Sequence, residues 1–114
     1  MESTERRELA VHAAALFNGG EYWLAHEALE GIWRSLDDGP EALILQGLIQ
    51  AAAALLHQSR GNLHGVRVVG KAALGKLNGP QLPSVEFETV DFRKALEVAL
   101  RGEGPAPILE LRMP

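Results

Sequence analysis

The sequence predicts an all-α protein: a single compact bundle of about five helices followed by an extended C-terminal tail. Apolar residues recur three and four positions apart through most of residues 1–101, as they do on one face of an α-helix. Clusters of glycine, proline and asparagine interrupt this pattern, and the only candidate strand is a short run in the tail. A chain of 114 residues suits one hydrophobic core, so we expect one domain over residues 1–114.

The first two helices are expected over residues 3–18 and 21–36. Ser3 or Thr4 offers a capping side chain at the start of the first helix. The Asn-Gly-Gly sequence that follows it ends this helix, because glycine readily adopts the left-handed conformation found at helix ends. The second helix has an apolar face that runs from Tyr22 to its end.

The third and fourth helices are expected over residues 40–59 and 62–78. The third begins at a proline, which suits the first helical position. Between residues 42 and 56 its only polar side chains are Gln46 and Gln50. A helix that is apolar nearly all round is normally surrounded by others, so this one is predicted to be the central helix.

The last part of the chain is expected to form a loop, a short helix and a tail. Residues 80–88 contain two prolines and little periodicity, which indicates a surface loop. A fifth helix is expected over residues 89–101, with Phe92 and Leu96 on its buried face. We expect the tail, residues 102–114, to be an extended strap, because no other candidate strand is available to pair with it.

Composition excludes several classes of protein. The net charge is −4 and the 11 basic residues are scattered along the chain, so nucleic acid is not an expected partner. The chain has no cysteine, which excludes disulfides and thiolate sites. The N-terminus is charged and Gln50 breaks the longest apolar run, so no signal peptide or membrane span is expected. We therefore expect a soluble, cytoplasmic protein.

Polar side chains lie within the apolar stripes of the second and third helices. Residues four apart share a helix face, so His26 and Glu30 stack in the second helix, while Gln46 and Gln50 stack in the third. These groups need partners when they are buried. They predict a polar cluster or pocket between the two helices, with six candidate residues: His26, Glu30, Trp33, Gln46, Gln50 and His57.

Two interpretations of this cluster remain open. The favoured one is a buried hydrogen-bond network in a structural or interaction protein. The alternative is a metal-dependent hydrolase, in which His26, Glu30 and His57 hold a divalent ion and Glu27 or Glu30 takes a proton from water. The zinc-protease pattern requires a histidine at position 30, and the Glu-x-x-His pair of di-iron bundles does not occur in this chain.

A third interpretation is a peptide-binding or small-ligand-binding module. Gly19, Tyr22 and Gly31 have the small, aromatic, small spacing of a tetratricopeptide hairpin, and a similar spacing begins at Gly61. Tyr22 and Trp23 would then form the walls of the binding site. Trp23 points away from the apolar stripe in helical projection, which suggests a subunit contact or a ligand wall, and we expect a homo-oligomer.

The strings FNGGEYWLAHEALEGIWR, LQGLIQAAAALLH and RGNLHGV, taken in this order, resemble a family of small all-helical bacterial and archaeal proteins called domain of unknown function 309. The resemblance covers residues 17 to about 77 and implies a helical bundle. Members of the family are sometimes labelled predicted metal-dependent hydrolases, so the resemblance carries that activity as a hypothesis. The matching positions are Asn18, Gly20, Tyr22, His26, Glu27, Glu30, Trp33, Gln46, Gly47, Gln50, His57, Asn62 and Gly65.

Overall fold

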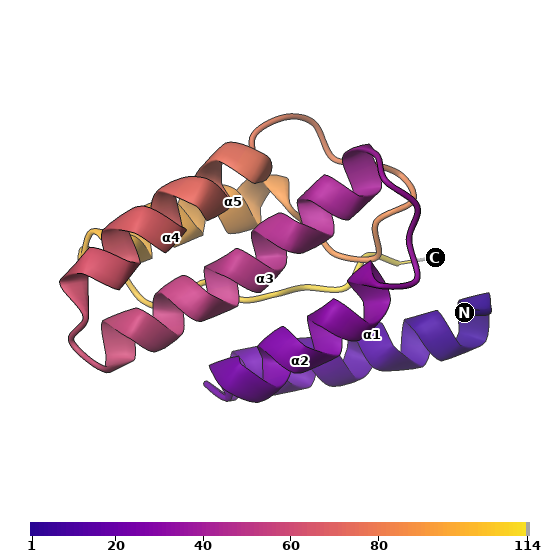
Figure 1. The fold of residues 1–114 in the computed structure, drawn as a ribbon, viewed down its shortest axis with the longest axis horizontal. Helices are drawn as coiled ribbons and strands as arrows, with labels where there is room; N and C mark the ends of the chain where they lie inside the picture. Colours follow the sequence, from indigo (N-terminus) through magenta and orange to yellow (C-terminus); the bar gives the residue numbers. More distant parts are fainter. Residues whose placement is uncertain (114) are drawn as a thin grey trace.

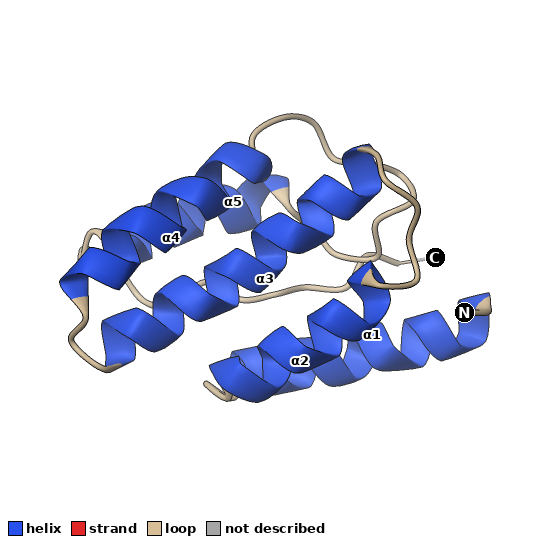
Figure 2. Ribbon diagram, in the orientation of Figure 1, coloured by secondary structure: helices blue, strands red, loops and turns tan. Residues whose placement is uncertain are grey.

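The structure, a computed structural model, describes residues 1–113 and has the predicted all-α class. Consecutive helices α1 to α4 pack against one another, and α3 lies between α2 and α4 (Figure 1), which confirms the predicted central helix. The predicted ends agree with the observed ones to within two residues, except at the end of α2. The helices (Figure 2) are α1 (Ser3–Asn18), α2 (Tyr22–Trp33), α3 (Pro40–Ser59), α4 (Leu63–Lys76) and α5 (Val90–Leu100).

The two ends of the α1–α2 hairpin differ from the prediction in different ways. The side chain of Glu2 caps α1 by accepting a hydrogen bond from the backbone N–H of Glu5. The prediction of a Ser3 or Thr4 cap is therefore wrong, because both residues already lie within the helix. The turn into α2 uses Gly20 at a φ of 80°, as the Asn-Gly-Gly sequence predicts.

Helix α2 ends at Trp33, three residues before the predicted end. The hydroxyl of Ser35 donates to the carbonyl of Ile32 at 2.6 Å, and the N–H of Ser35 bonds the same carbonyl at 3.0 Å. Hydrogen bonds three residues apart tighten the chain into a turn, so the helix does not continue to Leu36.

One hydrophobic core joins all five helices with the segment between α4 and α5 and with the tail. Its three phenylalanines are almost fully buried and come from different parts of the chain: Phe17, Phe87 and Phe92. Among the described residues, α3 alone is long and apolar enough to cross a membrane by length and composition. Since 56% of that window is buried inside the bundle, α3 has the character of a core helix.

The tail is extended, as predicted, but it does have a partner. Phe87 and Leu111 form an isolated antiparallel bridge. On either side, the N–H of Glu88 bonds the carbonyl of Glu110 at 2.9 Å, and the N–H of Arg112 bonds the carbonyl of Glu86 at 2.7 Å. The expectation that nothing pairs with the tail is therefore wrong, because the segment before α5 supplies backbone partners.

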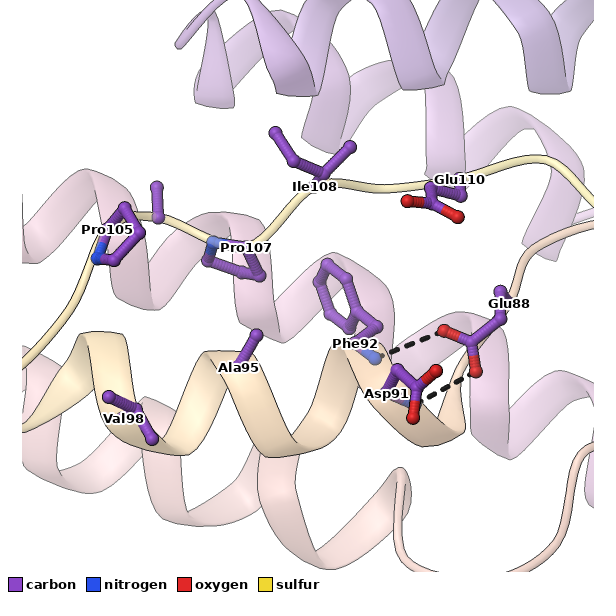
Figure 3. A pocket seen from close by; sticks show the side chains of 10 residues that line it. Glu88, Asp91, Phe92, Ala95, Val98, Pro105, Pro107, Ile108 and Glu110 are labelled. Carbon is purple, nitrogen blue, oxygen red and sulfur yellow. Dashed lines mark hydrogen bonds between the residues drawn. The ribbon is translucent and has the colours of Figure 1, made fainter.

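Side chains hold the tail against the rest of the bundle. Asn18, at the end of α1, donates to the carbonyl of Leu109 at 3.0 Å and accepts from its N–H at 2.8 Å. Arg7 donates to the carbonyl of Arg112 at 2.9 Å. Figure 3 shows the tail running alongside α5, with Pro107 above that helix. The residues drawn there line a hollow of about 430 Å³.

Candidate functional site

A hollow of about 260 Å³ opens between α2 and α3. Glu30 and Trp33 line it from α2, and Gln46, Ile49 and Gln50 line it from α3. Glu30 and Trp33 are three residues apart, and Gln46 and Gln50 are four apart. Each pair therefore shares one face of its helix, the face toward the other helix. The hollow thus brings together four of the six residues predicted for the polar cluster.

Two polar residues that line this hollow, Glu30 and Gln50, have partners within the chain. Arg34, the residue after α2, donates to Oε2 of Glu30 at 2.7 Å, an ion pair between residues four apart. Lys76, at the end of α4, donates to Oε1 of Gln50 at 2.9 Å. The hollow is therefore bordered by one carboxylate and two cations, and Lys76 links α4 to the central helix.

His26 lies beside the hollow without lining it. Its Nδ1 atom is 3.0 Å from Oε1 of Glu30, so a protonated imidazole forms an ion pair there. The two atoms are not aligned for a hydrogen bond, and this buried nitrogen has no hydrogen-bond partner among residues 1–113. The ring stacks on the indole of Trp23, with centroids 5.4 Å apart and planes 6° from parallel.

His57 lies at the other end of α3, apart from this group. Eleven residues separate it from Gln46, which amounts to about 16 Å along a helix. Its Nδ1 is 3.1 Å from Nδ2 of Asn62, and its ring packs against Gly65, where an added Cβ would lie 2.5 Å from the ring. The side chain therefore packs into the turn between α3 and α4.

The predicted metal ligands do not converge. Within residues 1–113, no three His, Asp or Glu side chains are placed to hold a metal ion together. The set of His26, Glu30 and His57 is thus not assembled in this structure. The second catalytic candidate, Glu27, is exposed and does not line the hollow, because adjacent helical residues point about 100° apart.

The two side chains proposed as walls of a ligand site, Tyr22 and Trp23, have different surroundings and do not form a common wall. Tyr22 packs edge-on against Phe17, with centroids 5.2 Å apart, and burial raises the pKa of its phenol. Trp23 points outward and is 57% exposed. Tyr22 and Gly31 both lie within α2, while Gly19 precedes it, so these three positions do not form a helical hairpin.

A groove of about 820 Å³ between α4 and α5 was not predicted from the sequence. Arg67 and Lys71 border it from α4, and Arg93, Glu97 and Arg101 border it from α5 and its C-cap. Each set recurs every four residues, so the spacing already indicates two charged helix faces. The basic residues looked scattered because nothing in the sequence shows that α4 and α5 lie side by side.

A second missed feature is an ion-pair cluster around Arg6. Its guanidinium contacts the carboxylates of Glu41 and Glu86 and thereby joins α1 to α3 and to the segment before α5. Burial alone would lower the pKa of Arg6, but the hydrogen bonds and charges of the two carboxylates raise it above its ordinary value. Nε of Arg6 is buried beside Glu86 without an aligned hydrogen bond. The two ion pairs join three segments of the chain, which indicates a structural role.

Comparison with known proteins gives a family and one relative. The family model described as "Domain of unknown function (DUF309)" matches residues 10–69. An "Uncharacterized protein" of Aquifex aeolicus is 36% identical over 74 residues, which cover 64% of this chain and 22% of that protein. The matched region is thus a small part of the relative's length. No solved structure matches this chain.

Proposed function

The chain belongs to the family called domain of unknown function 309, and from this premise and the geometry of the α2–α3 hollow we propose that it is a non-catalytic interaction protein. In this proposal the histidine, glutamate and glutamine side chains of α2 and α3 are structural and stabilise the packing of the bundle. A chain without cysteine suits the reducing conditions of the cytoplasm, where we propose that it acts.

The observation that carries the proposal is that most of these polar side chains already have partners inside the chain. Glu30 contacts Arg34 and His26, and Gln50 is bound by Lys76. His57 is held by Asn62 at the far end of α3. These contacts hold side chains along α2 and join α3 to α4 and to the turn between them, whereas a hydrolytic site needs groups that converge on a point where substrate and water meet.

The metal-dependent alternative has one observation in its favour, the unpartnered Nδ1 of His26 beside Glu30. These two residues supply two ligands from a single helix. Catalytic zinc sites use three protein ligands and keep a further position open for water. Since no third His, Asp or Glu among residues 1–113 completes such a set, the residues present do not fit a hydrolytic metal centre.

Calorimetric titration of the purified chain with Zn²⁺ and Mn²⁺ tests the proposal. We expect no stoichiometric uptake by the wild type or by His26→Ala. We also expect His26→Ala to lower the free energy of unfolding by about 1 kcal/mol, since it removes a partner of Glu30 and the stacking surface of Trp23. His12→Ala is the matched control, because His12 is an exposed residue of α1. Uptake of about one ion per chain that is lost only in His26→Ala would establish the metal site instead.

We also propose that the protein is a homo-oligomer that uses the outer face of α2. Trp23 is exposed on this face beside the exposed Leu24. The stacked His26 ring holds the indole in one orientation, which lowers the entropy cost of burying it in an interface. Tryptophan is also enriched among the residues that contribute most to binding energy.

Sedimentation velocity over a range of concentrations tests this contact. We expect the wild type to sediment as a dimer or a larger oligomer and Trp23→Ala to shift toward the monomer. Leu43→Ala, which removes an exposed side chain from α3, should sediment like the wild type. A wild-type protein that stays monomeric at every concentration would contradict the proposed contact.

A further inference from the structure

The groove between α4 and α5 combines an apolar floor with an opening large enough for a ligand. Val66 and Leu74 from α4 and Leu100 from α5 are among its apolar lining residues. An added Cβ at Gly70 would lie 2.9 Å from a methyl group of Leu100, so the helices approach closely at this glycine. The volume of about 820 Å³ falls within the range of known binding sites.

The rim of this groove is positively charged, in contrast to the whole chain. Arg67 and Lys71 stand on α4, and they have no ion-pair partner among residues 1–113. Arg93 on α5 and Arg101 at its C-cap share the carboxylate of Glu97, at 3.2 and 3.1 Å. Arg101 also pairs with Glu103, at 3.0 Å. The groove thus carries four cations and one carboxylate, whereas the net charge of the chain is −4.

We propose that this groove binds an amphipathic helix of a partner protein, with acidic residues flanking the helix's apolar stripe. The inference rests on the proposed interaction role and names the partner's chemistry. The lining runs from Leu63 to Gly75, about 18 Å of helix, which matches three turns of a bound helix. Apolar side chains of the partner fill the floor, and its carboxylates face Arg67 and Lys71 across the rim.

The shape of the groove favours a helix over other acidic surfaces. A lipid bilayer presents a broad face, which would meet the cations of the rim and leave the floor between the two helices uncovered. A nucleic acid presents a continuous run of phosphates, which would meet the carboxylate of Glu97 between Arg93 and Arg101. A helix places carboxylates at chosen positions and inserts separate apolar side chains.

A designed peptide tests the inference by fluorescence anisotropy at physiological ionic strength. The probe is a helix of about four turns with leucine at positions i, i+3, i+4 and i+7 and glutamate on both flanks. A second peptide keeps the leucines and replaces every glutamate with lysine. The protein variant is Arg67→Glu/Lys71→Glu, which reverses the two free cations, and the control is Lys94→Glu on an exposed position of α5 outside the groove.

We expect the wild type and Lys94→Glu to bind the acidic peptide with similar, micromolar dissociation constants. Neither protein should bind the lysine peptide. The double variant should bind at least about tenfold more weakly, and added salt should weaken wild-type binding. Equal binding by the double variant, or no preference for the acidic peptide, would overturn the inference. Binding to anionic vesicles or to single-stranded RNA without binding to the peptide would also overturn it.

Failure of this inference can be told apart from failure of the proposed function. If the peptide does not bind and the metal titration also shows no ion, the interaction role stands and the α4–α5 groove has a different occupant or none. If about one ion binds per chain and is lost in His26→Ala, the interaction role itself fails, whatever the peptide does.

Discussion

Replacing Phe92 with alanine should lower the free energy of unfolding by about 3–5 kcal/mol, the usual cost of removing a buried aromatic ring. Phe92 is 2% exposed at the start of α5. Its ring meets that of Phe17 edge-on, with centroids 5.5 Å apart. Because α5 packs less extensively on the other helices than they do on one another, this ring is a main anchor of α5.

Val98 provides the matched control on the same helix. It is 36% exposed, so Val98→Ala should change the free energy of unfolding by less than about 0.5 kcal/mol. Urea denaturation followed by circular dichroism gives both values, and the slope of the transition reports the surface that unfolds. Similar losses in the two variants would show that Phe92 does not anchor α5. A smaller slope in Phe92→Ala alone would mean that α5 separates from the bundle first, and peptide binding in the α4–α5 groove should then be lost.

The elements that sequence predicted best are those that local chemistry determines. The apolar run around Gln46 and Gln50 specifies a central helix wherever its neighbours lie, because so little of its surface is polar. The ion pair between Glu30 and Arg34 follows from helical spacing alone. The end of α2 was missed because backbone hydrogen bonds from Ser35 and Leu36 and the hydroxyl of Ser35 form the turn, and neither residue type excludes a helix.

The features that sequence missed depend on contacts between distant residues. Asn18 and Leu109 are 91 positions apart, and neither residue carries a local signature of the other. The α4–α5 groove similarly requires two helices to lie side by side, and periodicity cannot show this. The candidate cluster was predicted in part, since Glu30, Trp33, Gln46 and Gln50 do meet. His57 was predicted as a member of the cluster because it lies on the same face of α3 as Gln46. It does not reach the hollow, because it lies near the C-terminal end of this helix.

Substitutions at two neighbouring tail residues, Ile108 and Leu109, should show whether this segment without regular structure contributes to the core. Leu109 is 1% exposed, whereas its neighbour Ile108 is 57% exposed. Removing a buried leucine side chain costs about 2–5 kcal/mol, so Leu109→Ala should destabilise the protein by that amount. Ile108→Ala should change the free energy of unfolding by less than about 0.5 kcal/mol.

Chemical denaturation of the two variants side by side measures this difference. The backbone of Leu109 stays bonded to Asn18 in both proteins, so the comparison isolates the buried side chain. Similar stabilities would show that the tail only covers a core that is complete without it. A loss confined to Leu109→Ala would mean that the tail completes the core, since the buried side chain of Leu109 fills space that the helices leave open.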